Sequence, residues 1–288
     1  MTFKIGFHVS ISGGIQNSVL RAQEIGCTAF QIFTRSPRGW AARDLTESDI
    51  ESFKSNLKKS KIQSNSVAVN MPLMVNLSGP DGELHEKSIG SFTNELIRTS
   101  KLGIEYLVAD IGSDMGHGKE NGIKQFVNSC EKGIDNYKSA YKKKLDVTIL
   151  LENGWASVNS LGSKLEDLRE ILDKLPDKKY GICLDTCHAF ISGYDLRTSD
   201  SSAKFVEEIN EIVGLDTIKL IHLNDSKHDL GSHSDYHERV GLGKIGLEGL
   251  GTIINHSSLR DLPMIMQVPY YSEDDYSNDL KTVLKLRT

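Results

Sequence analysis

The chain has few cysteines and no excess of positive charge, and each shortage excludes a class of protein. Its 288 residues include four cysteines, and no two of them form a C-x-x-C pair. We therefore expect a reduced protein of the cytoplasm, without a cysteine-based zinc motif. The net charge of −5 is not that of a typical basic nucleic-acid binder, although metal ions bound in an acidic site would reverse the local field.

Long apolar runs and linkers are also missing. No apolar stretch approaches the length that spans a bilayer, so no membrane partner is expected. The N-terminus leads straight into an apolar strand and lacks signal-peptide organisation. No proline-, serine- or glycine-rich linker divides the chain, so we expect residues 1–288 to form a single domain, and we expect a monomer.

The segment Gly181–Phe190 is the most informative part of the sequence. An apolar strand ends there in Asp185, and His188 follows three residues later. A carboxylate and an imidazole at this spacing are typical ligands of zinc and related ions. The alternative is that Asp185 only caps the start of a helix.

Apolar, β-branched segments recur at nearly constant distances and alternate with helical patterns. The predicted strands are Phe3–His8, Thr28–Phe33, Ser66–Asn70, Tyr106–Asp110, Val147–Glu152, Tyr180–Asp185, Thr217–His222 and Met264–Gln267. The predicted helices are Gly14–Ile25, Thr46–Ser60, His85–Leu102, Ile123–Tyr141, Ser163–Leu175, Ser202–Val213 and Leu247–Asn255. This alternation predicts an α/β fold, a (β/α)₈ TIM barrel. A doubly wound open sheet is the alternative, but it usually carries a glycine-rich phosphate loop, and Ser12-Gly13-Gly14 is a weak match.

Most of the predicted strands end in a polar residue. The ends are His8, Asn70, Asp110, Glu152, Asp185, His222 and Gln267. A barrel gathers such ends at one face, where enzymes of this fold place their active sites. Asp235 and His237 follow the seventh strand, and with His188 they would make a His₂Asp zinc site with an open position.

Several motifs together resemble endonuclease IV, a family of metal-dependent apurinic/apyrimidinic endonucleases. They are Gly6–Gly14, Phe33–Trp40, Leu151–Asn153, Gly181–Phe190, Ser192–Arg197, His222–Lys227 and Gly231–His237. The resemblance implies a TIM barrel that holds three zinc ions. Such an enzyme would cleave double-stranded DNA on the 5′ side of abasic sites. His188, Asp235 and His237 match the family's third zinc site.

The resemblance also assigns the remaining site residues. Asp185, His222 and Glu152 match ligands of the second zinc site, with Glu152 bridging to the first and acting in catalysis. Arg38 and Trp40 match a loop that grips distorted DNA.

The chain departs from the family at the ends of four strands. Where the family has histidines, this chain has Asn70 and Asp110, and where it has a final glutamate, this chain has Gln267. We expect the third site to bind zinc, the second to bind it weakly, and the first to be empty or altered, so fewer than three ions and a slowed or lost nuclease. Substitutions such as Leu73 and Trp155 add apolar bulk to the rim. The residues expected to contact substrate are Arg38, Trp40, Trp155, Gln267 and Tyr270.

Three alternatives remain open. The barrel has been repurposed or designed for a small molecule, with Asp110 or Asp114 as the general base in an apolar pocket. It is a sugar isomerase or epimerase, although Gln267 replaces the last carboxylate that such a site needs. It is a DNA-damage binder without catalysis.

Overall fold

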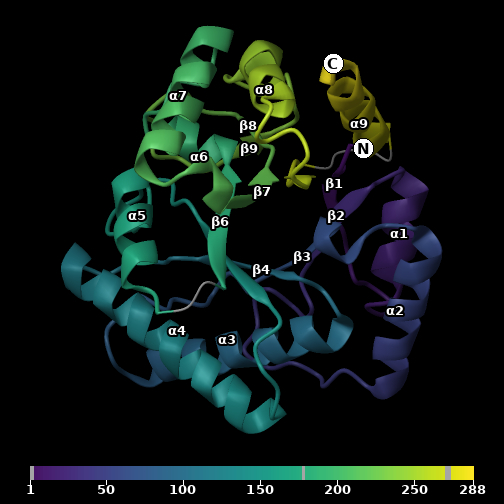
Figure 1. Cartoon of the computed structure of the whole chain (residues 1–288), viewed down its shortest axis with the longest axis vertical. Helices are drawn as coiled ribbons and strands as arrows, with labels where there is room; N and C mark the ends of the chain where they lie inside the picture. Colours follow the sequence, from purple (N-terminus) through teal and green to yellow (C-terminus); the bar gives the residue numbers. More distant parts are fainter. Residues whose placement is uncertain (1–2, 177–178, 270–273) are drawn as a thin grey trace.

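Eight parallel strands close into a barrel, and helices surround it on the outside (Figure 1). The structure is a computed structural model that describes residues 3–176, 179–269 and 274–288. The strands are β1 (Ile5–His8), β2 (Ala29–Ile32), β3 (Val67–Asn70), β4 (Tyr106–Asp110), β5 (Thr148–Glu152), β6 (Tyr180–Asp185), β7 (Ile218–His222) and β10 (Met264–Met266). Their order around the barrel is β1-β10-β7-β6-β5-β4-β3-β2, so β1 and β10 complete the ring.

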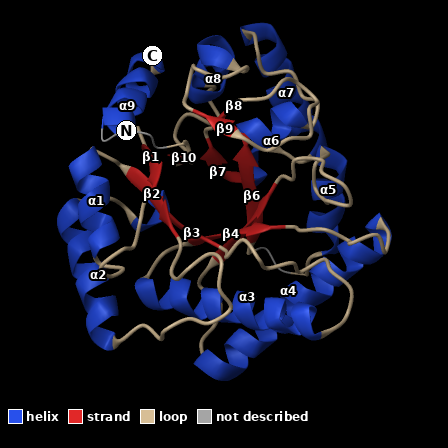
Figure 2. Cartoon of the chain, turned by 180° about the vertical axis from the view of Figure 1, so that it is seen from behind, coloured by secondary structure: helices blue, strands red, loops and turns tan. Residues whose placement is uncertain are grey.

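The helices return the chain from one strand to the next (Figure 2). They are α1 (Asn17–Ile25), α2 (Glu47–Ser60), α3 (Glu83–Leu102), α4 (Lys119–Tyr141), α5 (Leu165–Lys174), α6 (Thr186–Ile191), α7 (Ser199–Ile212), α8 (Gly246–Asn255) and α9 (Asp274–Leu286). A short hairpin of β8 (Asp225–Ser226) and β9 (His237–Glu238) follows β7. Within the described ranges, every helix is too short or too polar to cross a bilayer.

The predicted barrel is confirmed, and the open doubly wound sheet is excluded because the sheet closes. The predicted strand bounds are within two residues of the observed ones, and the helix bounds are within four. Thr46 and Asp49 form a capping box at the start of α2. The prediction missed α6, α9 and the β8–β9 hairpin, which are additions to the simple alternation.

An inward-facing apolar layer lies inside the barrel. It consists of Ala29, Ala68, Val108, Leu150, Cys183, Leu220 and Ile265, and Tyr106 lies one level lower, two residues before Val108 on β4. A second and larger apolar cluster lies between the strands and the helices. Because side chains alternate between the two faces of a strand, residues two positions after the inward layer also point into the barrel, one level higher.

Two helical glycines test how closely the outer layer packs. A Cβ at Gly249 in α8 would lie 1.6 Å from the carbonyl oxygen of Leu196, whereas a Cβ at exposed Gly90 in α3 meets no atom within 4 Å. We expect Gly249→Ala to lower the free energy of unfolding by about 1–3 kcal/mol through overpacking. Gly90→Ala should raise it by about 0.5–1 kcal/mol through helix propensity. Urea denaturation measures both, and equal effects would contradict the packing shown.

Candidate metal centre

The polar residues of the site form the inward-facing layer just above the apolar one. Two positions beyond its members lie Gln31, Asn70, Asp110, Glu152, Asp185, His222 and Gln267. Five of these seven residues are the last of their strands. His8, which lies two positions after Gly6, also ends its strand. Seven strand ends were predicted from the sequence, and the structure places six of them at the ends of β1, β3, β4, β5, β6 and β7, with Gln267 one residue beyond β10. The carboxyl face of the barrel therefore carries a ring of buried and half-buried polar side chains.

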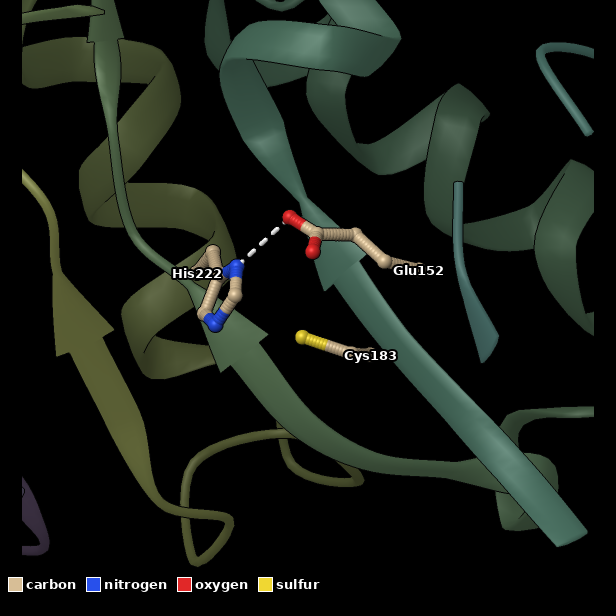
Figure 3. A group of neighbouring side chains, drawn as sticks. All are labelled: Glu152, Cys183 and His222. Atoms are coloured by element: carbon tan, nitrogen blue, oxygen red, sulfur yellow. Dashed lines mark hydrogen bonds and ion pairs between the residues drawn. The ribbon is translucent and has the colours of Figure 1, made fainter. Parts of the chain in front are cut away.

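Glu152 and His222 meet across the barrel from β5 and β7. His222 Nδ1 lies 2.7 Å from Glu152 Oε1, and both side chains are buried. Figure 3 shows that the thiol of Cys183 points toward the same space from β6, and the three residues can surround one ion. Burial raises the pKa of Cys183 well above its ordinary value, so in the metal-free chain this residue is a neutral thiol.

The two carboxylate oxygens of Asp185 have different partners. Oδ1 accepts a hydrogen bond of 2.9 Å from the backbone N–H of His188 and so caps α6. Oδ2 lies 3.8 Å from His222 Nδ1 and 3.7 Å from His237 Nε2. The helix-cap interpretation of Asp185 is therefore correct for one oxygen, while the other oxygen faces two imidazoles.

His188, Asp235 and His237 come together from α6, the hairpin loop and β9. The Asp235 carboxylate lies 3.4 Å from His188 Nε2 and 3.2 Å from His237 Nε2. Asp185, His188 and His237 also lie close enough to surround one ion. The structure thus brings together all six residues that the sequence suggested as metal ligands.

Backbone carbonyl groups fix the orientation of both imidazoles. The Nδ1 atom of His188 lies 2.9 Å from the carbonyl oxygen of Asn153, and that of His237 lies 2.9 Å from the carbonyl oxygen of Gln267. Nδ1 is therefore a donor in each ring, and Nε2 faces the carboxylates, where a metal ion could bind it in place of a proton. Nε2 of His237 is buried and makes no well-aligned hydrogen bond within the described residues, although Asp235 Oδ1 lies 3.2 Å away.

The electrostatic field at this site favours positive charge. Burial opposes a charge on His188, but the carboxylates of Asp185, Asp235 and Glu152 outweigh it and raise the pKa of this imidazole. The pKa of His237 is raised against burial by Asp185 and Asp235. Burial raises the pKa of Asp235, but the adjacent His188 and His237 imidazoles outweigh burial and lower this pKa. A metal cation would satisfy the same field and displace these protons.

Asp110 lies beside this group but in a more apolar setting. It pairs in register with Glu152, and both line a cavity of about 200 Å³ together with Trp155, Leu73 and Ile111. Burial, and then the charge of Glu152, raise the pKa of Asp110 to about 7. Asp114 instead accepts a hydrogen bond from the N–H of Gly116 within a turn. Of the two aspartates considered as a general base, Asp110 is the one that lines the cavity.

The remaining predicted residues lie around the rim. Arg38 is exposed on the loop after β2, and Trp40 lines a separate cavity of about 430 Å³ with Met74 and Leu84. The side chain of Gln267 accepts a hydrogen bond of 3.3 Å from Asn224. Tyr270 lies outside the described residues.

Three residues that support the site were not predicted from the sequence. Gln31 contacts His222 Nε2 at 2.9 Å, and Asn224 donates a 2.6 Å hydrogen bond to Asp185 Oδ2. Asn153 donates to the carbonyl oxygen of Asp185 and accepts from its N–H. The period of two identifies Gln31, because it follows the inward-facing Ala29. The amide partners of Asp185 had no comparable signal in the sequence.

Comparison with known proteins identifies the family. A family profile described as "Xylose isomerase-like TIM barrel" matches residues 19–286. "Probable endonuclease 4" of Nitrosopumilus maritimus is 45% identical over 285 residues, which are 99% of each chain. The chain belongs to the endonuclease IV family.

Two further members support this assignment. Endonuclease IV of Thermus thermophilus has a solved structure that matches with a TM-score of 0.86 and 31% identity, over 98% of each chain. "Apurinic-apyrimidinic endonuclease 1" of Saccharomyces cerevisiae is 35% identical over 281 residues, 97% of this chain and 75% of the yeast protein. The family resemblance in the sequence is therefore confirmed for the whole barrel.

Asn153 offers a test of how this endonuclease IV relative holds Asp185. We expect Asn153→Ala to lower the free energy of unfolding by about 2–4 kcal/mol, because two buried backbone groups of Asp185 lose their partners. Asn121→Ala is the matched control, since Asn121 makes one exposed hydrogen bond to the His117 carbonyl group. Urea denaturation should show a change of less than about 0.5 kcal/mol for this control. Equal stability of the two variants would contradict the supporting role of Asn153.

Proposed function

We propose that this protein is a metal-dependent phosphodiesterase that nicks double-stranded DNA on the 5′ side of abasic sites. The names of its relatives support a hydrolase of this kind. The observation that carries the proposal is the arrangement of His188, Asp235 and His237, in which Nε2 of each imidazole lies within 3.4 Å of the Asp235 carboxylate. Two oriented imidazoles and one carboxylate are a donor set that suits zinc and leaves a position open.

We assign the strongest zinc site to His188, Asp235 and His237. A second and weaker site comprises Glu152, Asp185 and His222, where neutral Gln267 stands in place of an anionic ligand. The first site of the family does not fit an imidazole-bound zinc here, because Asn70 and Asp110 offer only oxygen atoms. We therefore infer fewer than three zinc ions and a slower enzyme than a member with all its ligands.

Different residues of the site have different roles in the proposed reaction. Bound zinc would supply a water of lowered pKa and neutralise charge on the phosphate. Asp185 lies between His222 and His237 and so connects the two ligand sets. Asp110, with a pKa of about 7, holds or releases a proton on its carboxylate near neutral pH. Exposed Arg38 offers a cation to the DNA backbone, and Trp40 and Trp155 provide apolar surface near the lesion.

The cysteines bear on the compartment in which the protein acts. All four cysteines are unpaired and buried, which agrees with a reducing compartment and supports action in the cytoplasm. We infer abasic double-stranded DNA as the partner and retain the monomer as the expected state.

A second candidate function rests on the cavity that Asp110 shares with Trp155. A carboxylate with a pKa of about 7 beside an apolar wall suits proton transfer on a small, flat molecule. A sugar isomerase or epimerase is less favoured, because Gln267 cannot supply the anionic oxygen that such a metal site uses. Specific binding of abasic DNA without incision would instead indicate a damage binder.

The first functional test is incision of a duplex that contains one abasic site. Zinc-loaded protein should nick the lesion strand on its 5′ side, and removal of the metal with a chelator should abolish the nick and lower the melting temperature, because the metal binds only the folded chain. An intact duplex of the same sequence is the control substrate. No incision by protein with measured zinc content would reject the proposal.

The second test restores a carboxylate to the weaker site. Gln267→Glu should raise zinc affinity on the order of tenfold, because changes around a metal's direct ligands alone alter its affinity about 10–100-fold. The incision rate should rise with it. Gln63→Glu, the same change at an exposed position, is the matched control for added charge. Unchanged zinc affinity in Gln267→Glu would show that residue 267 is not part of the metal site.

A further inference from the structure

A row of hydrogen bonds leads from the metal centre to a neighbouring cavity. Glu152 Oε1 lies 2.7 Å from His222 Nδ1, and His222 Nε2 lies 2.9 Å from Gln31 Oε1. The amide nitrogen of Gln31 then lies 3.2 Å from His8 Nδ1. We call Glu152, His222, Gln31 and His8 the relay, and its members come from β5, β7, β2 and β1.

The amide of Gln31 sets the proton positions along the relay. Its oxygen only accepts, so Nε2 of His222 carries a hydrogen, which leaves Nδ1 as the ring nitrogen that a metal beside Glu152 would bind in place of a proton. This is the tautomer that a metal ligand needs. The amide nitrogen of Gln31 only donates, so Nδ1 of His8 is an acceptor.

His8 therefore carries its ring hydrogen on Nε2. Burial, and then the nearby His222, lower the pKa of His8 to about 3, so the ring is neutral and has a single N–H. Nε2 is buried and has no partner within the described residues. A buried donor without a partner is unfavourable, and a molecule bound at the site can supply the missing acceptor.

The cavity that His8 lines suits an uncharged group. Its volume is about 270 Å³, and its polar lining includes Asn70 and Gln267. Phe33, Leu73 and Val268 supply apolar walls, and no lysine, arginine, aspartate or glutamate is among the described residues that line it. A phosphate group would find no cation here, whereas a sugar finds hydrogen-bonding groups between apolar surfaces.

We propose that His8 is a substrate-contacting residue, whose Nε2–H donates a hydrogen bond to an uncharged oxygen of the abasic sugar. Gln31 is its positioning residue, because the amide couples the proton on His8 to the metal-binding tautomer of His222. The proposal rests on the proposed function, since it names a contact that the abasic substrate makes at that site.

Two substitutions of His8 separate the donor from the ring. His8→Gln places an N–H near the position of Nε2, whereas His8→Asn places one only near Nδ1. With the zinc-loaded variants and a duplex that carries one abasic site, kcat/KM should be about tenfold lower for His8→Asn than for His8→Gln. Zinc content should be the same in both. His256→Gln, a change beyond the far end of α8, is the control. Equal kcat/KM values for the two His8 variants would overturn the proposal.

Nitrogen NMR of the unmodified, zinc-loaded protein tests the relay directly. The ring of His8 should carry its proton on Nε2, and this assignment should be lost in Gln31→Met but kept in Gln63→Met. A proton on Nδ1 of His8 in the loaded protein would overturn the relay, even if the His8 variants fail to fold. If the wild-type protein leaves abasic DNA intact, the proposed function fails. The affinities of the two His8 variants for uncut abasic duplex then decide whether His8 contacts it.

Discussion

The divided use of the Asp185 carboxylate is the constraint on which the rest of the site depends. One oxygen caps α6 through the N–H of His188 and thereby fixes the backbone position from which that imidazole extends. The other oxygen faces His222 and His237, and Asn224 donates a hydrogen bond to it. A single buried carboxylate therefore holds a helix start and two ligand sets in one geometry. The spacing of three residues between Asp185 and His188 in the sequence reflects this double requirement.

The fold and the inward-facing ligands were predictable because both follow from local periodicity. Alternation of strands with helices gives the barrel, and a period of two places Glu152, Asp185 and His222 on its inner surface. The relative heights of the strands arise from closure of the whole sheet, so the sequence alone could not show which Nε2 atoms meet Asp235. Gln31 escaped notice because β2 continues past it. Asn153 bonds to the backbone of Asp185, and Asn224 bonds to its side chain from beyond the end of β7, so neither residue belongs to a strand-end pattern in the sequence.

The donor atoms of the site differ between the two sides of the barrel. His188, Asp235 and His237 lie on the side of β6 and β7, and their carbonyl partners hold both rings in the ligand orientation. Asn70 and Asp110 end β3 and β4 on the other side, next to apolar Leu73. Imidazoles suit borderline ions, whereas amide and carboxylate oxygens suit hard ones. The site thus combines a half built around imidazoles with a half built around oxygen atoms.

The two halves are not independent, because hydrogen bonds cross from one to the other. Gln31 is joined to His222 on one side and to His8 on the other, and His8 lines a cavity with Asn70 and Gln267. Gln267 in turn accepts from His237 through its carbonyl oxygen and from Asn224 through its side chain. A charged residue at position 70 or 267 would therefore alter which ring nitrogens of the neighbouring histidines carry protons. Neutral amides at positions 70 and 267 keep that cavity free of charge, which leaves the N–H of His8 as a donor for an uncharged oxygen.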